Sequence, residues 1–187
     1  GYIKEWGMEQ IVRDCRISTL YEGTTGIQAL DLLGRKILLS RGKSLKSFTM
    51  EILGFCKDKS LISKNPHKRQ MNKFIWPLSK AVANWQQYSV RLSLKAKKDR
   101  DIVGSASVDY LMFSGYITMG YFWAQMAQAA YEKLAGDVEN RDFYRAKIKT
   151  AEFYFERILP RIKSHAATMM ADPKSLMQLD EELLSFL

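Results

Sequence analysis

Glu22 is the residue of this chain best placed to do chemistry, because it stands between an apolar approach and a turn of small residues. Leu20 and Tyr21 precede it, so we expect its carboxyl group to leave the backbone beside nonpolar surface. Loss of water disfavours the charged form of a carboxyl group and raises its pKa. A carboxylate with a raised pKa is well matched to proton abstraction near neutral pH. The pattern therefore predicts a general base at Glu22.

The residues after Glu22 predict a tight turn followed by a helix. Gly23 can adopt a positive φ and lets a ligand come close to the backbone. Thr24 and Thr25 are good N-cap residues, and the amide groups at the start of a helix can bind an anion. The helix is predicted over residues 26–39, with one apolar face made of Ile27, Leu30, Leu33 and Ile37. The alternative is a capped surface helix with an exposed glutamate near its positive end.

Residues 13–28 resemble the catalytic segment of the acyl-CoA dehydrogenase family, which has the pattern R-D-x-[RK]-I-x-x-[IL]-Y-E-G-T. The matching positions are Arg13, Asp14, Arg16, Ile17, Leu20, Tyr21, Glu22, Gly23 and Thr24. The continuation over residues 25–36 is similar to the longer members of that family, which carry an additional helical region at the C-terminus. The methylthioalkanoyl-CoA dehydrogenases are among them. The resemblance is tight over residues 9–36 and looser over the rest of the chain.

This resemblance implies a role for each residue of the motif. Glu22 would remove the α-proton of an acyl-CoA thioester, while the β-hydrogen leaves as hydride to FAD and a trans-2-enoyl-CoA forms. Gly23 would lie against the substrate. Arg35 would lie near the substrate too, although it is one residue out of register with a basic position that touches substrate in some relatives. Three residues would face the FAD: Thr24, Thr25 and Gly26.

The resemblance also implies how the chain is organised and what it works with. Residues 1–40 would end the C-terminal helical domain and carry the catalytic loop, and residues 41–187 would form the additional helical bundle. The family's N-terminal helical domain and middle β domain help to build the FAD site, so we expect this chain alone to bind no FAD and to be inactive. The expected partners are an acyl-CoA, an electron-transfer flavoprotein or similar acceptor, and further copies of the chain in a homodimer or larger oligomer. The sequence does not decide which acyl chain length is preferred, or whether the enzyme is a dehydrogenase or an oxidase.

Composition and periodicity predict an all-α antiparallel helical bundle. The chain has 187 residues, of which 47% are hydrophobic and only four are proline, so a sizeable core is feasible. Loops are expected at residues 58–70 and at the small-residue segment 101–107. Helices are expected over residues 1–16, 26–39, 44–57, 71–99, 107–134, 140–165 and 173–187. The helix over residues 71–99 should carry one inward stripe of Leu78, Val82, Trp85, Ser89 and Leu92. The helix over residues 140–165 should have Phe143, Tyr154 and Phe155 on its inward face, and Pro160 should bend its end. Such a bundle could also be a non-catalytic assembly module, with a subunit interface at Met112, Met119 and Met126.

The net charge of +9 is concentrated in residues 41–73, where nine Lys or Arg face two acids, a local charge of +7. This basic segment could attract the phosphates of CoA, or it could be an ordinary solvated face. No motif for nucleic-acid binding accompanies it, so no nucleic-acid partner is expected.

Other features of the sequence bear on membrane spans, on the cellular compartment and on metal binding. No apolar run approaches the roughly 20 residues needed to span a bilayer. Cys15 and Cys56 form no disulfide or metal pattern, which favours a reducing cytoplasm. His67 and His165 lack partners at ligand spacing, so we expect surface histidines and no metal site.

Overall fold

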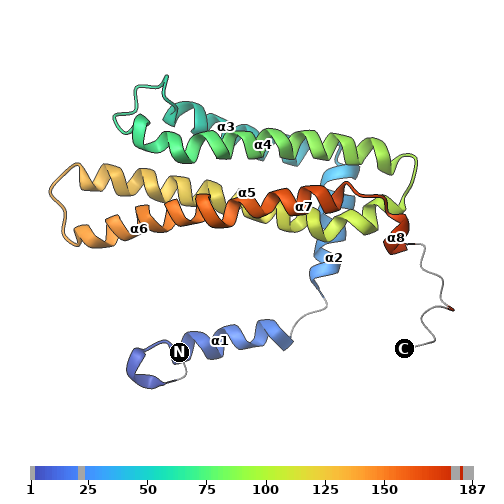
Figure 1. The fold of residues 1–187 in the computed structure, drawn as a ribbon, viewed down its shortest axis with the longest axis horizontal. Coiled ribbons are helices and arrows are strands. Elements are labelled where there is room, and N and C mark those ends of the chain that lie inside the picture. Colours follow the sequence, from blue (N-terminus) through green and yellow to red (C-terminus); the bar gives the residue numbers. More distant parts are fainter. Residues whose placement is uncertain (1–2, 21–23, 178–181, 183–187) are drawn as a thin grey trace.

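The prediction of an all-α bundle is confirmed by the computed structural model. The structure describes residues 3–20, 24–177 and 182, and this part of the chain is helical without a β-strand. Long, roughly antiparallel helices form the bundle, while the N-terminal helix over residues 9–20 lies apart from it (Figure 1). None of the helices in the described ranges is long and apolar enough to cross a membrane.

The helices follow in chain order, with short π and 3₁₀ segments between some of them. Before the bundle come η1 (Lys4–Trp6), α1 (Glu9–Leu20), α2 (Thr25–Leu30) and the π-helix η2 (Asp31–Leu39). The bundle then contains α3 (Lys43–Lys59), α4 (Lys68–Ala96), α5 (Asp101–Leu134), α6 (Arg141–Phe153), the π turn η3 (Tyr154–Ile158), the 3₁₀ turn η4 (Leu159–Arg161), α7 (Ile162–Met169) and α8 (Lys174–Met177).

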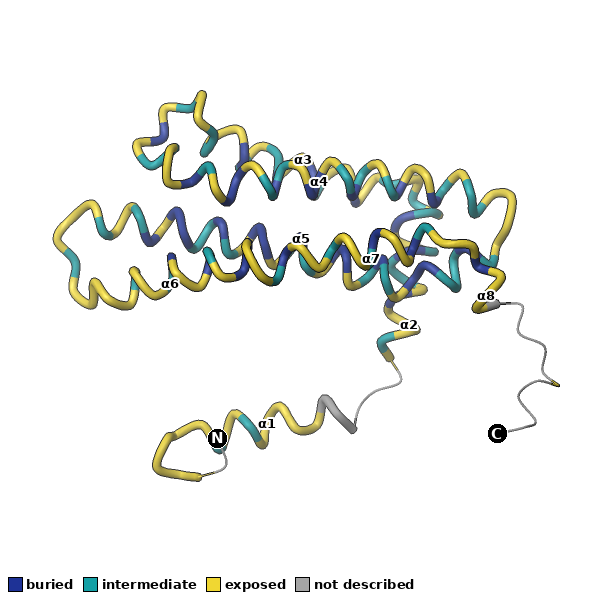
Figure 2. Tube along the Cα trace, in the orientation of Figure 1, coloured by how far each residue is buried: buried dark blue, intermediate teal, exposed yellow. Residues whose placement is uncertain are grey.

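Helix α5 is the centre of the bundle. It packs against α4 on one side and against α6 and α7 on the other, and α2 and η2 also contact it (Figure 1). Its neighbour α4 buries the stripe that the helical periodicity predicts, namely Leu78, Val82, Trp85, Ser89 and Leu92. Burying a large apolar side chain contributes about 1.5–3 kcal/mol, so this stripe is a main source of stability. Figure 2 shows buried residues recurring along both helices.

The loop predicted at residues 101–107 is wrong, because α5 begins at Asp101. The backbone N–H of Asp101 donates to the Asp99 carboxylate at 3.0 Å, which helps to start the helix there. Ala106 and Ser107 are buried within the helix. Small residues at this point therefore allow close helix packing instead of marking a break.

The last long helix also differs from the prediction of one helix over residues 140–165. Pro160 has no N–H to donate to the preceding turn, and the chain passes through the π turn η3 and the 3₁₀ turn η4 before α7 begins. Phe143, predicted to face inward, is exposed, whereas Tyr154 and Phe155 are buried as predicted.

The helix predicted over residues 26–39 is present, but most of it is a π-helix. Leu33 and Ile37 enter the core, whereas Ile27 and Leu30, predicted on the same face, are exposed. The wider π turns shift the register of side chains relative to a 3.6-residue period, so the buried face differs from the predicted one.

Candidate functional site

The structure describes only part of the predicted site. Glu22, the predicted base, and Gly23, the predicted substrate contact, lie outside the described residues. The three predicted cofactor residues are described: Thr24 is the N-cap of α2, and Thr25 and Gly26 are its first two residues. The site can therefore be built from the residues that follow the predicted base.

The start of α2 presents accessible backbone. The carbonyl of Thr24 accepts a hydrogen bond from the N–H of Gln28 at 2.8 Å, but its side chain makes no capping bond. Gly26 is exposed, and a Cβ built there would meet nothing within 4 Å. A flat group such as a flavin could thus approach the backbone at the start of α2 closely, which fits the cofactor that the resemblance implies.

The segment that follows is held firmly by the bundle. Ala29 and Leu33 have no solvent exposure and Ile37 is nearly buried, and α2 and η2 together contact α5. Gly34 faces Val103 of α5, whose Cγ1 lies 3.7 Å from the position of an added Cβ. The downstream end of the predicted catalytic loop is therefore attached to a rigid element, which is how catalytic loops are usually positioned.

Arg35, the predicted substrate contact, is engaged locally. Its guanidinium forms an ion pair with Asp31 one turn earlier, and Lys36 Nζ lies 3.4 Å from the same carboxylate. The hydrogen bond from Arg35 is the main reason that the pKa of Asp31 lies below its usual value. Arg35 is exposed and lies more than two helical turns beyond Gly26, so the described residues do not bring the two together.

The two histidines are not the plain surface residues predicted. His165 is half-buried, with its Nδ1 2.7 Å from Oδ1 of Asp109 and its ring stacked on Tyr116 at 5.6 Å between centroids. His67 is half-buried as well and stacks on Tyr131 at 5.7 Å. Their partners are far away in the sequence, so no local spacing could have revealed them. Within the described ranges, no group of three or more His, Cys, Asp or Glu could hold a metal ion.

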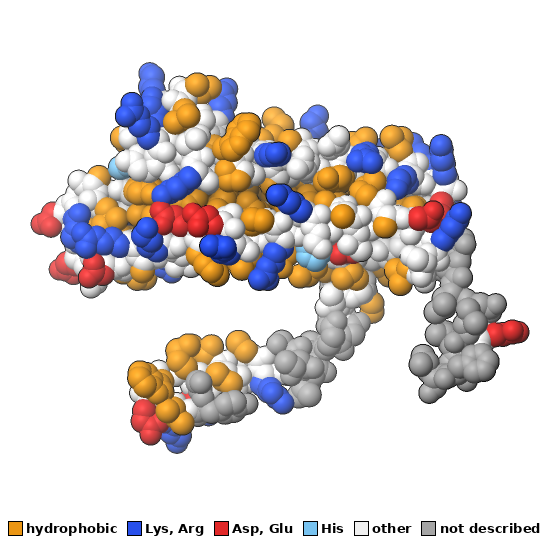
Figure 3. All heavy atoms as spheres, viewed as in Figure 1, with side chains coloured by type: hydrophobic (Ala, Val, Ile, Leu, Met, Phe, Trp, Pro, Cys, Tyr) orange, Lys and Arg blue, Asp and Glu red, His pale blue; other side chains and the backbone are white. Residues whose placement is uncertain are grey.

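The basic segment 41–73 includes cations that pair with acidic residues of other helices. Lys73 forms an ion pair with Glu152 of α6, and Lys59 approaches Glu132 of α5 at 4.0 Å. Figure 3 shows Lys and Arg side chains scattered over one face of the bundle, with hydrophobic side chains exposed between them. Part of this basic charge therefore joins helices together, and the remainder is on the surface.

The known proteins that this chain matches belong to the same family that the motif around Glu22 resembles. The family described as "Acetyl-CoA dehydrogenase C-terminal like" matches residues 48–180. The "Broad-specificity linear acyl-CoA dehydrogenase" of Mycobacterium tuberculosis is 30% identical over 97% of this chain and 30% of its own length. The "3-methylmercaptopropionyl-CoA dehydrogenase" of Ruegeria pomeroyi is 35% identical over 85% of this chain and 26% of its own length.

A shorter match is to a subunit of the "Caffeyl-CoA reductase-Etf complex" of Acetobacterium woodii, 50% identical over 18% of this chain and 9% of that subunit. The chain thus spans less than a third of the length of the curated relatives that it matches. The family match covers most of the chain, and the relatives match nearly all of it. The chain therefore belongs to the acyl-CoA dehydrogenases, as a part of their helical C-terminal region.

Proposed function

We propose that this chain is the C-terminal part of a flavin-dependent acyl-CoA dehydrogenase that oxidises an acyl-CoA thioester to the trans-2-enoyl-CoA. The observation that carries the proposal is the position of the motif. Glu22 ends a family-like catalytic segment and stands just before a helix that the bundle holds in place. The dehydrogenases among its relatives support the same reaction class.

In the proposed mechanism, the Glu22 carboxylate takes the α-proton of the thioester, and the C–H bond electrons move toward the thioester carbonyl. The backbone N–H of Glu22 donates to the thioester oxygen and stabilises the negative charge that develops there. Gly23 lets the substrate approach the backbone. Flavin, when bound, supplies the acceptor for the hydride that leaves the β-carbon. Exclusion of water from the closed site keeps the pKa of the base high enough for this step.

The remaining residues of the site have supporting roles in this proposal. Thr24, Thr25 and Gly26 face the cofactor, and Arg35 turns from Asp31 toward the substrate when the site is assembled. Further parts of a whole enzyme complete the FAD site, so residues 1–187 alone are inactive and bind no FAD. We place the boundary between the catalytic helical domain and the added bundle at residues 40 and 41.

The electron acceptor in this proposal is an electron-transfer flavoprotein or a similar protein. One relative is a subunit of a reductase–Etf complex, which supports this acceptor class. A reducing cytoplasm is the proposed compartment. Cys15 lies in α1 and Cys56 is buried in α3, and burial raises the pKa of the Cys56 thiol, which makes it a poor nucleophile.

Anaerobic flavin bleaching in the full-length enzyme tests the proposal. Acyl-CoAs of several lengths and a methylthio-acyl-CoA are added in turn, and the fastest bleaching identifies the substrate class. Glu22→Gln should keep FAD and acyl-CoA binding but lose flavin reduction, whereas Glu5→Gln, in exposed η1, should reduce flavin normally. Reduction at the wild-type rate in the Glu22→Gln enzyme would contradict the assignment of the base.

A second role, assembly of the enzyme, is supported by an exposed apolar row on α5. Val108, Met112, Met119 and Phe122 are all exposed, and their spacing places them on one face of the helix. A second copy of the chain could cover this row. Met119→Lys in the full-length protein should then lower the oligomer mass measured by light scattering. Leu61→Lys, at another exposed site, should not, and an unchanged mass for Met119→Lys would reject the interface.

A further inference from the structure

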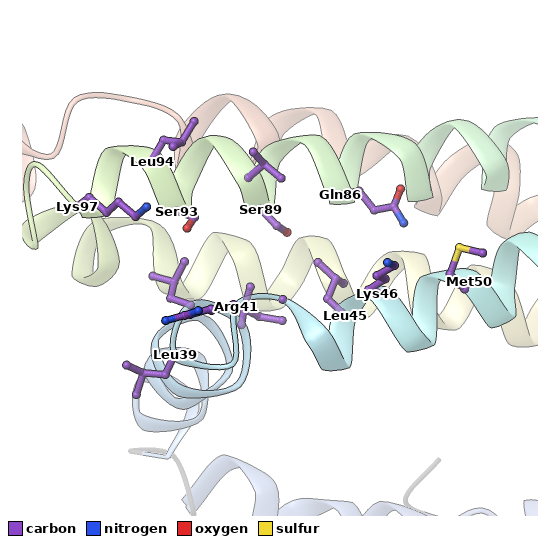
Figure 4. A pocket seen from close by; sticks show the side chains of 14 residues that line it. Leu39, Arg41, Leu45, Lys46, Met50, Gln86, Ser89, Ser93, Leu94 and Lys97 are labelled. Carbon is purple, nitrogen blue, oxygen red and sulfur yellow. The ribbon is translucent and has the colours of Figure 1, made fainter.

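A groove lies between the start of α3 and the second half of α4. Its volume is about 980 Å³, within the range of small-molecule sites. The lining residues run from Ile37 near the end of η2 to Met50 on α3, and from Gln86 on α4 to Lys97, which caps the end of that helix (Figure 4). Thr24, Thr25, Gly26 and Arg35 are not among them, so the groove shares no lining residue with the described part of the proposed catalytic site.

The walls of the groove are mainly apolar. Leu45 on α3 and Val90 and Leu94 on α4 line it, and both α4 residues are exposed. The polar groups beneath them are largely engaged within the protein. Gln86 Nε2 donates to Thr49 Oγ1 at 2.7 Å, and Ser89 Oγ donates to the Trp85 carbonyl at 2.7 Å. The body of a ligand here would therefore meet hydrocarbon and few hydrogen-bonding partners.

The rim of the groove is cationic. Arg41, Lys46 and Lys97 line it, and none of the described residues that line it is acidic. Within the described part of the chain, none of these three side chains forms an ion pair or a hydrogen bond. Arg41 and Gly42 both have left-handed backbone, with φ of 54° and 72°, and this turn places Arg41 beside the groove. Arg41 and Lys97 lie toward one end of the groove beside apolar walls, whereas Lys46 lies between Leu45 and Met50 (Figure 4). The pair at one end complements a ligand that is anionic at one end and apolar along its length.

We propose that this groove binds an amphiphile with one straight alkyl chain and an anionic head group, a carboxylate or a phosphate. The head lies between Arg41 and Lys97, which sit at the same end of the groove in Figure 4, and the chain lies along Leu45 and Val90 toward Met50. The α4 wall from Gln86 to Lys97 extends roughly 16 Å, long enough for an extended chain. An extended peptide fits less well, because its backbone would need partners that these walls lack.

Calorimetric titration of the full-length protein tests this proposal. Dodecanoate, dodecyl phosphate and dodecanol are added below their micelle-forming concentrations. At least one of the two anions should bind about tenfold more tightly than the neutral alcohol, because two or more partly exposed ion pairs add to the same chain burial. Binding of dodecanoate alone would identify a fatty acid, and binding of dodecyl phosphate alone would identify a phosphate head group.

Variants separate the groove from any other acyl site of the enzyme. Arg41→Gln with Lys97→Gln should weaken binding of the preferred anion about tenfold, whereas Lys43→Gln, a neighbouring cation outside the groove, should change it less than about twofold. Leu94→Glu places a carboxylate in the groove at a position that is 58% exposed, so it should abolish groove binding without unfolding the protein. The proposal is overturned if dodecanol binds as tightly as both anions. It is also overturned if the folded Leu94→Glu protein binds the anion like the wild type. Flavin bleaching by acyl-CoA should be unaffected in these groove variants, so the test of the groove is independent of the proposed reaction.

Discussion

Tyr110→Phe should cost the bundle about 2–3 kcal/mol, although it removes a single oxygen atom. Tyr110 is 0% exposed, and its hydroxyl accepts a hydrogen bond from Trp85 Nε1 at 3.0 Å. The same hydroxyl lies 2.7 Å from Ser89 Oγ. Trp85 and Ser89 are on α4, so this buried cluster joins the two longest helices directly beneath the groove.

The magnitude follows from the groups that the substitution leaves behind. Trp85 would keep a buried indole N–H without an acceptor, which costs about 1–3 kcal/mol. Ser89 would lose one partner but keep its bond to the Trp85 carbonyl, so its contribution should stay below about 1 kcal/mol. The ring itself still fills its place, so no cavity is created.

Urea unfolding followed by circular dichroism measures this loss, and Tyr121→Phe is the matched control. The Tyr121 ring is also buried, but its hydroxyl donates to Glu51 Oε1 at 3.2 Å, and Glu51 is exposed. Glu51 can turn to water when the hydroxyl is removed, so Tyr121→Phe should cost less than about 1 kcal/mol. Equal losses for the two variants would refute the argument that a buried, unpaired indole N–H sets the cost.

Unfolding at alkaline pH is a second test of the cluster formed by Tyr110, Trp85 and Ser89. Burial raises the pKa of Tyr110 to about 12, although the hydrogen bonds with Ser89 and Trp85 lower it in part. A raised pKa means that the folded state keeps the proton longer than the unfolded state. Its contribution to stability is therefore complete below about pH 10 and is lost as the pH rises toward 12. Tyr110→Phe should lose less stability across this interval than the wild type does, and parallel curves would contradict this.

Two further predictions concern glycines and an ion pair between helices. Gly54→Ala on α3 should raise the free energy of unfolding by up to about 1 kcal/mol, because a Cβ there meets nothing within 4 Å. Gly42→Ala should lower the free energy of unfolding by about 1–2 kcal/mol, because Gly42 has a φ of 72°. Thermal unfolding of the pair checks both signs. Glu152→Gln should cost about 1 kcal/mol at neutral pH, because its carboxylate pairs with Lys149 and Lys73, which hold its pKa below the usual value. This contribution should be present above about pH 4.5 and should disappear as the pH falls through the lowered pKa, so acid unfolding curves of the two proteins should converge.

Helical periodicity was enough to predict which residues of α4 are buried, because the stripe from Leu78 to Leu92 repeats at the spacing of a regular helix. The same reasoning failed where the helix is irregular. Ile27 and Leu30 were placed on the wrong face because nothing in the local sequence marks the change to a π-helix at Asp31. The small residues after Asp101 resembled a break, yet they are the residues that let α5 pack closely.

The candidate site shows the same division between local and long-range information. The order and spacing of residues around Glu22 are local, so the motif could be found from sequence alone. The hydrogen-bonded contact between His165 and Asp109 and the cations of the groove are brought together from segments far apart in the chain. The charge of the basic segment can be counted from its sequence, but only the packing of α3 against α4 shows which of its cations border an apolar groove.

One residue connects the two regions to which we assign functions. Ile37 belongs to the core, where it anchors the helix that follows the catalytic motif, and it also lines the groove. A substitution at Ile37 would disturb both, so its effect on flavin reduction or on amphiphile binding could not be interpreted. Arg41, Lys97 and Leu94 are exposed and lie outside the core. Changes at these three positions can therefore alter the groove while the attachment of the motif to the bundle is kept.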